Sequence, residues 1–231
     1  MKVRLFMMLG GNGTRFGDPL PKQFHQLSGK PVFKWIADEY SRENIIDSAI
    51  IVINKKYENI IKSELKNCQF PYCTVEGGNE RSISVRNALL KGIDEGFNDD
   101  DVILIHDATH PIVDSEAVKK VITVTKEHGI ATVASRVLDT AYETNSEKNR
   151  VKNLLSRDYI AVAGSPEAFK FSLLKKVYLD ADENLIKKIT CTGALANSLG
   201  LDLNVVWMDM PNIKLTFKHD LDLLERWFNA I

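Results

Sequence analysis

The first residues with types and spacing suited to chemistry lie in a glycine-rich segment, LGGNGTRFGDPLPKQF, between Leu9 and Phe24. Its first turn carries no bulky side chain, so backbone N–H groups can face an anion without interference from Cβ atoms. Arg15 and Lys22 follow, and a polyphosphate whose charge moves during a reaction requires cations in such places. Glycines alone would favour a flexible turn, whereas the two cations favour a phosphate site.

This segment does not match the common glycine-rich phosphate motifs. No Gly-Lys-Ser/Thr follows, which excludes a Walker A loop. The dinucleotide pattern GxGxxG can be placed on Gly11, Gly13 and Phe16 only by losing its third glycine. The sequence therefore indicates a phosphate loop of another kind.

A carboxylate follows a second apolar run, in LIHDATHP at 104–111. Asp107 comes directly after this run, and a hard carboxylate beside a phosphate site suits Mg²⁺, which prefers one or two carboxylates plus phosphate oxygens. The alternative is an Asp that caps the following turn. Taken alone, this motif does not separate the two.

A second double glycine occurs in EGGNERSISVRNAL at 76–89, where a helix is expected to begin near Glu80. Backbone donors and Ser84 could hold a base or a ribose. The alternative is an ordinary helix N-terminus capped by Ser82 or Asn79.

A lysine stands out in MPNIKLTFKHDL at 210–221. If this segment is a strand, Lys214 faces away from its apolar neighbours Ile213 and Leu215. It then either reaches a phosphate or is solvated, and in isolation the solvated state is favoured.

The elements that must position these residues alternate along the chain. Nearly continuous apolar runs predict strands at Val3–Leu9, Ala49–Ile53, Cys73–Glu76, Val102–Ile105 and Ile130–Val137. Amphipathic stretches predict helices at Pro31–Arg42, Tyr57–Lys66, Glu80–Gly92 and Ser115–His128. This pattern is typical of a Rossmann-like α/β fold, with a mostly parallel sheet and helices on both faces. Ligands of such folds bind beyond the carboxyl ends of the strands.

The alternation breaks at a polar, turn-rich insertion, residues 139–159, which we interpret as an arm. Beyond it we expect helices near Pro166–Tyr178 and Thr190–Leu199, a strand at Asn204–Met208 and a last helix from Asp220. With no internal repeat or linker, residues 1–231 are predicted to form one domain.

Composition limits the partners. The net charge of −1 provides no general attraction for nucleic acid, and no apolar stretch approaches the length of a bilayer span. The three cysteines, Cys68, Cys73 and Cys191, have no metal-ligand spacing, which favours a reducing compartment. The expectation is a cytoplasmic protein that binds neither nucleic acid nor membrane.

Taken together in this order, the motifs resemble the 2-C-methyl-D-erythritol 4-phosphate cytidylyltransferase family and its close relatives, the ribitol 5-phosphate cytidylyltransferases. The resemblance covers nearly the whole chain. It rests on GGNGTRFG…PKQF, GGNERSISV, IHDATHP, LDT at 138–140, Arg157, SPEAF at 165–169 and NIKLT at 212–216. The combination is specific although each motif is weak.

The resemblance implies a nucleotidyltransferase fold whose protruding β-arm joins two subunits in a homodimer. It implies transfer of CMP from CTP to a polyol or sugar phosphate, with Mg²⁺ and release of pyrophosphate. Arg15, Lys22 and Lys214 would act on the phosphates, and Asp107 would hold the metal. His110, Thr140 and Arg157 would bind the acceptor, one or both of the last two from the partner subunit. The nucleotide would lie against Leu9, Gly10, Gly11, Gly13, Gly78, Asn79, Ser84 and Ala108.

Departures from the family pattern concern the acceptor. His110 replaces an arginine that helps bind the acceptor phosphate, Ser165-Pro166-Glu167 replaces TPQ, and Cys191 replaces an acidic residue. We therefore expect a polyol phosphate of surface-polymer synthesis, with ribitol 5-phosphate favoured. The alternatives are the isoprenoid substrate and a CTP-binding regulator or subunit that has lost transfer activity. A dehydrogenase is the poorest fit, because no acidic residue ends the strand at 50–54 to hold a ribose.

Overall fold

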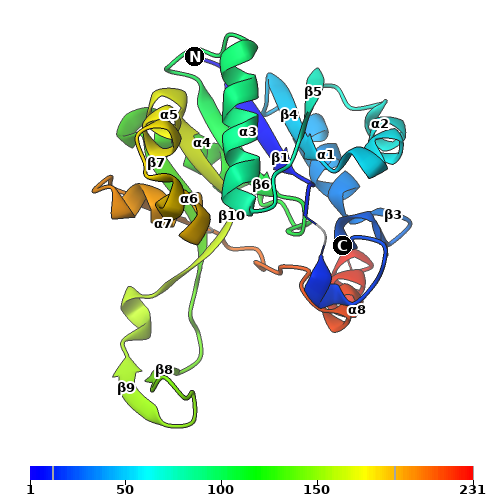
Figure 1. Ribbon diagram of the computed structural model, residues 1–231. Helices are drawn as coiled ribbons and strands as arrows, with labels where there is room; N and C mark the ends of the chain where they lie inside the picture. The colour runs from blue at the N-terminus through cyan, green and yellow to red at the C-terminus, as the bar shows by residue number, and fades with distance from the viewer. Residues whose placement is uncertain (12, 190, 231) are drawn as a thin grey trace.

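The computed structural model describes residues 1–11, 13–189 and 191–230, and its centre is a seven-stranded sheet with helices on both faces (Figure 1). The strands, in spatial order, are β11 (Asn204–Trp207), β7 (Ile130–Arg136), β10 (Ala161–Lys170), β6 (Val102–Asp107), β1 (Val3–Met8), β4 (Ser48–Ile53) and β5 (Tyr72–Glu76).

The sheet is parallel except at β10, which runs antiparallel to both of its neighbours. Strands β1, β4, β5 and β6 consequently end at one edge. Met8 of β1 pairs with Val52 of β4 and with Asp107 of β6. The loops after these four strands therefore converge, which is where an α/β sheet binds its ligands.

Side chains of β1 alternate between two cores, as the period of a strand requires. Leu5 and Met7 pack in one core cluster, and Phe6 packs in the other. The first cluster is covered by α1 (Val32–Glu43), α2 (Glu58–Leu65) and α4 (Ser115–His128). The second is covered by α3 (Arg81–Asp94), α5 (Phe171–Leu179), α6 (Glu183–Lys188) and α7 (Thr192–Ser198).

A third apolar cluster lies outside the sheet and fixes the two segments that carry the candidate lysines. Phe16, Leu27, Leu215 and Leu224 are buried in it. The elements here are the short helices η1 (Thr14–Phe16) and η2 (Lys22–Phe24), the hairpin of β2 (Gln26–Leu27) and β3 (Lys30–Pro31), and α8 (Lys218–Phe228). The glycine-rich segment is thereby held against the chain that precedes α8.

The insertion forms an arm that projects away from the sheet (Figure 1). It consists of β8 (Ala141–Thr144) and β9 (Val151–Leu155), which pair only with each other among the described residues, followed by the short helix η4 (Arg157–Tyr159). Its apolar side chains are exposed, to 69% at Leu154 and 91% at Tyr159. A lone two-stranded hairpin is marginally stable in water, so this arm lacks the packing that would normally support it.

The expected fold class is confirmed, and the expected strands and helices of the first 137 residues are all present within two residues of their bounds. The helix expected near Pro166–Tyr178 is wrong over its first part. Residues Pro166–Lys170 belong to β10, and the helix begins at Phe171. The pairing register of β10 shifts between Ala163 and Glu167, so Pro166 lies where the ladder is interrupted and its missing N–H is tolerated.

Two smaller differences concern the end of the chain. The expected helix at Thr190–Leu199 is α7, and Thr190 itself lies outside the described residues. Residues 211–217 form no strand, yet Lys214 is exposed and Leu215 is buried, as expected from their alternation. Among the described helices none combines the length and apolarity needed to cross a membrane.

Candidate active site

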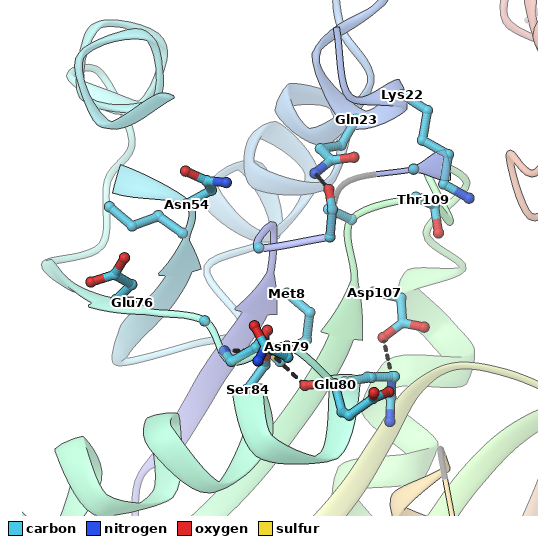
Figure 2. Close-up of a pocket in the computed structure, with 18 of the residues that line it drawn as sticks. Met8, Lys22, Gln23, Asn54, Glu76, Asn79, Glu80, Ser84, Asp107 and Thr109 are labelled. Atoms are coloured by element: carbon cyan, nitrogen blue, oxygen red, sulfur yellow. Dashed lines mark hydrogen bonds and ion pairs between the residues drawn. The ribbon is translucent and has the colours of Figure 1, made fainter. Parts of the chain in front are cut away.

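A cavity of about 490 Å³ opens where the loops after β1, β4, β5 and β6 converge (Figure 2). The structure brings most of the expected site residues together around it. Those that line it are Gly10, Gly11, Gly13, Arg15, Lys22, Gly78, Asn79, Ser84, Asp107, Ala108 and Lys214.

The two double-glycine loops both line the cavity and approach each other closely. A Cβ atom on Gly10 would lie 3.4 Å from the Cα atom of Gly77, and one on Gly78 would lie 2.3 Å from Cγ2 of Ile83. Gly13 has φ +63°, a conformation that side chains disfavour. Gly13 and Gly78 are thus required by the backbone geometry, whereas a Cβ atom on Gly10 would be at the limit of ordinary contact and one on Gly11 would meet no described atom within 4 Å.

Ser84 fixes the second glycine loop. Its Oγ accepts a hydrogen bond from the N–H of Gly78 at 3.0 Å and donates to the carbonyl oxygen of Glu80 at 3.1 Å. Within the described part of the chain no side-chain hydrogen bond caps α3, so the capping alternative for Asn79 and Ser82 is not observed. The loop is therefore held by Ser84 while Asn79 remains on the cavity wall.

Lys22 is a half-buried cation at one end of the cavity. Its Nζ donates to the carbonyl oxygen of Leu215 at 2.5 Å, which links the glycine-rich segment to the segment that carries Lys214. Burial, with further contributions from Lys214 and Arg15, lowers the pKa of Lys22 to about 8. An anion bound between these cations would relieve their repulsion and favour the charged form of Lys22.

Asp107 lies between two cations. Nε of Arg81 donates to its Oδ1 at 2.8 Å, and Nζ of Lys214 donates to its Oδ2 at 3.2 Å. Burial by itself would raise the pKa of Asp107, but Arg81 and Lys214 outweigh it and hold the pKa well below its usual range. The carboxylate is therefore ionised, and its oxygens are directed at side chains of the site.

Arg81 is a site residue that the sequence did not identify, although it stands inside the GGNERSISV motif. Besides Asp107 it contacts Oγ1 of Thr192 at 3.3 Å and a carboxylate oxygen of Glu167 at 3.9 Å. Glu167 is 5% exposed, and it also accepts hydrogen bonds from Cys191 Sγ and Gly193 N–H, both at 3.1 Å. Arg81 thus joins α3 to β6, β10 and α7.

The sequence departures at 165–167 and 191 meet at this network. Ser165 Oγ accepts from the backbone N–H of Asp107 at 2.9 Å, and Glu167 contacts both Cys191 and Arg81. Ser165 therefore contacts Asp107, the candidate metal ligand, directly, and Glu167 contacts it through Arg81. The structure places them beside Asp107 and not on the arm.

The three expected acceptor residues do not line the main cavity. His110 is 7% exposed, its ring nitrogens have no hydrogen-bond partner among the described residues, and burial lowers its pKa to about 3. Thr140 and Arg157 are exposed on the arm, and Arg157 lines a separate hollow of about 260 Å³ with Arg136 and Trp207.

Two residues expected on the nucleotide are buried. Leu9 is fully buried in the core, and its carbonyl oxygen accepts a hydrogen bond from Gln23. Ala108 is also buried, at 1% exposure, although it lines the cavity. The cavity is also lined by residues that the sequence did not identify as site residues, namely Met8, Gln23, Ile53, Asn54, Glu76, Gly77, Glu80, Arg81 and Thr109.

The donor set fits a metal only in combination with phosphate. In the described part of the chain no three His, Cys, Asp or Glu side chains gather closely enough to hold an ion. Asp107 is the carboxylate of the cavity that lies among the phosphate-binding candidates, and one carboxylate plus phosphate oxygens is a usual Mg²⁺ arrangement.

Comparisons with known proteins give the family of this chain. Residues 3–229 match the family model described as IspD, 2-C-methyl-D-erythritol 4-phosphate cytidylyltransferase. The enzyme of that name from Petrotoga mobilis is 30% identical over 221 residues, 96% of each chain. Its counterpart from Thermotoga neapolitana is 29% identical over 94% of this chain and 92% of its own.

Solved structures show the same fold. The 4-diphosphocytidyl-2C-methyl-D-erythritol synthase of Anaerococcus prevotii superposes with a TM-score of 0.81 at 23% identity, over 99% of this chain and 98% of that one. The 2-C-methyl-D-erythritol 4-phosphate cytidylyltransferase of Francisella tularensis gives 0.80 at 25% identity, over 98% and 99%.

The fold is that of a nucleotidyltransferase. The chain belongs to the 2-C-methyl-D-erythritol 4-phosphate cytidylyltransferase family, and it is accordingly a CTP-dependent cytidylyltransferase.

Proposed function

We propose that this enzyme transfers CMP from CTP to 2-C-methyl-D-erythritol 4-phosphate, releasing pyrophosphate. The observation that carries the proposal is the cavity itself, which is lined by a bare glycine loop, by four cations and by three carboxylates, with Asp107 paired to two of the cations. The acceptor is taken from the relatives, whose names specify it. The comparisons thus favour the isoprenoid substrate over ribitol 5-phosphate, which the sequence alone favoured.

The chemistry requires no general base. A phosphomonoester has a second pKa near about 6, so at neutral pH the acceptor is already mostly a dianion that can attack the α-phosphorus. The barrier consists of bringing two anions together and stabilising the leaving pyrophosphate. His106 is not placed to act as a general base. Its ring is buried between Tyr40 and the carbonyl of His110, and burial lowers its pKa to about 4.

The side chains of the cavity divide this work. Lys22 and Arg15 would neutralise the β- and γ-phosphates. Lys214 would exchange its contact with Asp107 for the α-phosphate and stabilise the charge there. Asp107 would hold Mg²⁺, which when bound neutralises triphosphate charge and orients the leaving group. Arg81 would keep Asp107 in place from the opposite side.

The acceptor half of the site is proposed to come from a second copy of the chain. Thr140 and Arg157 lie outside the main cavity, and the arm that carries them exposes apolar side chains such as Leu154 and Tyr159. Pairing of two arms would cover these side chains and bring Arg157 of one copy toward the cavity of the other. The proposed enzyme is a homodimer.

Ribitol 5-phosphate remains a second candidate because of His110. A buried, neutral imidazole stands where the family has an arginine, so one cation for the acceptor phosphate is missing. A different polyol phosphate is the simplest consequence of such a change.

An acceptor screen tests the proposed function. We expect pyrophosphate release from CTP and Mg²⁺ with 2-C-methyl-D-erythritol 4-phosphate at a kcat/KM at least ten times that with ribitol 5-phosphate, erythritol 4-phosphate or glycerol 3-phosphate. His110→Arg should change the preference among these acceptors, because it restores a cation beside Asp107, and should leave the KM for CTP within about threefold.

Each outcome of the screen has a distinct meaning. A clear preference for ribitol 5-phosphate would replace the proposed acceptor with the second candidate. CTP binding without turnover of any acceptor would instead indicate a regulator or subunit that has lost transfer activity.

A further inference from the structure

Gln23 is a buried amide that contacts the backbone of the glycine loop. Its side chain is 3% exposed, and its Nε2 donates to the carbonyl oxygens of Leu9 and Gly11, each at 2.7 Å. A glutamine amide has two N–H donors, so both are committed to this loop. No charge and no ligand is needed to explain the two bonds.

These bonds determine which way the loop presents its peptide groups. In a trans peptide the N–H points away from the preceding carbonyl, and the cis bond of the described chain lies elsewhere, at Ser165–Pro166. Because the Leu9 carbonyl turns toward Gln23, the N–H of Gly10 turns to the other side. Figure 2 shows Gln23 on one side of the segment that follows β1 and Ser84 on the other.

The direction of the carbonyl oxygens is equally important for binding an anion. A carbonyl oxygen carries partial negative charge, and a glycine loop is free to turn it either way. Gln23 binds two of these oxygens and holds them away from the wall formed by Asn79 and Ser84. With the Leu9 carbonyl bound by Gln23, the N–H of Gly10 is left for the opposite side of the segment.

The position of Gln23 is itself fixed by its neighbours in η2. Phe24 is 5% exposed, with its ring 4.7 Å from Tyr57 and 5.6 Å from Phe33 between centroids. Lys22 is tied to Leu215 by its Nζ. A side chain whose neighbours are fixed in this way can in turn fix the peptide groups that it binds.

We propose that Gln23 is a positioning residue for the donor nucleotide. It acts through the backbone of the loop, by turning carbonyl groups away from the triphosphate and N–H groups toward it. The proposal rests on the placement of CTP in this cavity. It adds a neutral side chain to a site otherwise explained by its cations.

The test uses Gln23→Met in the full-length chain, because methionine keeps the length and volume of glutamine and removes both donors. Binding of CTP and of inorganic tripolyphosphate is measured by titration calorimetry, together with steady-state kinetics. We expect both dissociation constants to rise tenfold or more, and the KM for the acceptor to change less than threefold. Gln26→Met, at an exposed position of β2, is the matched control and should match the wild type.

A purely structural role gives a different result. If Gln23→Met folds cooperatively and lowers kcat while the dissociation constant for tripolyphosphate is unchanged, the proposal is overturned. If that variant does not fold, Gln23→Asn replaces it, since its amide keeps the donors but is too short to reach both carbonyls. An unchanged tripolyphosphate affinity in Gln23→Asn would also overturn the proposal. Failure of the wild type to bind CTP or tripolyphosphate would instead contradict the nucleotide site.

Discussion

Lys22→Ala is expected to lower kcat/KM for CTP by about 10³-fold, equivalent to about 4 kcal/mol of transition-state stabilisation. The half-buried ammonium of Lys22 lies with Arg15 and Lys214 around the cavity, and alanine leaves the developing pyrophosphate charge without one of its three cations. Steady-state pyrophosphate release measures the loss. Lys120→Ala, at an exposed position of α4, is the control and should retain wild-type activity.

The pH dependence of CTP binding tests whether Lys22 contacts the triphosphate. Its pKa of about 8 in the free enzyme means that the ammonium is lost as the pH rises through 8. Bound triphosphate favours the ammonium, so the dissociation constant for CTP should rise above pH 8 in the wild type, by up to about tenfold per pH unit. In Lys22→Ala this rise should be absent. Identical profiles in the two proteins, or a loss of less than tenfold in kcat/KM, would show that Lys22 does not contact the triphosphate.

Asp107→Asn is the second large expected effect, a loss of about 10³-fold in kcat/KM. The change keeps the shape of the side chain but removes the charge that pairs with Arg81 and Lys214 and that would hold Mg²⁺. The affinity for Mg²⁺ in the presence of CTP should fall together with activity. Magnesium titrations of pyrophosphate release, and manganese binding followed by electron paramagnetic resonance with CTP present, measure the two effects.

The control for Asp107 is Asp94→Asn, a surface change at the end of α3. It should leave both the rate and the metal affinity at wild-type values. If Asp107→Asn lowered the rate but bound manganese as the wild type does, the carboxylate would be acting on Lys214 and Arg81 and not on a metal.

The sequence predicted the first half of the fold because local and tertiary preferences agree there. The central strands β1, β4 and β6 are mostly apolar, as burial on two faces demands, and the helices α1, α2, α3 and α4 each carry an apolar stripe. The agreement fails at β10, where Pro166 suggests a helix start. Only the pairing of this strand with β6 and β7 makes residues Pro166–Lys170 extended, and such pairing is not encoded in local sequence.

The gathering of the proposed nucleotide-binding residues around one cavity was predictable for a similar reason. Glycines and charges that follow β1, β5 and β6 must meet at the carboxyl edge of a parallel sheet. Arg81 and Gln23 were missed because their roles depend on partners that folding brings near, the carboxylate of Asp107 and the carbonyls of Leu9 and Gly11. The burial of His110 is also a tertiary property, and it could not be inferred from the motif HDATHP.

The most direct test is a crystal structure of the enzyme with CTP and Mg²⁺. We expect the triphosphate along the backbone of Gly10–Gly13 with Lys22 and Arg15 on its oxygens, and the metal on Asp107. The cytosine should lie against Gly78 and Ser84. A nucleotide bound outside this cavity, or bound within it with the base at Lys22 and the phosphates at Ser84, would contradict the proposed site.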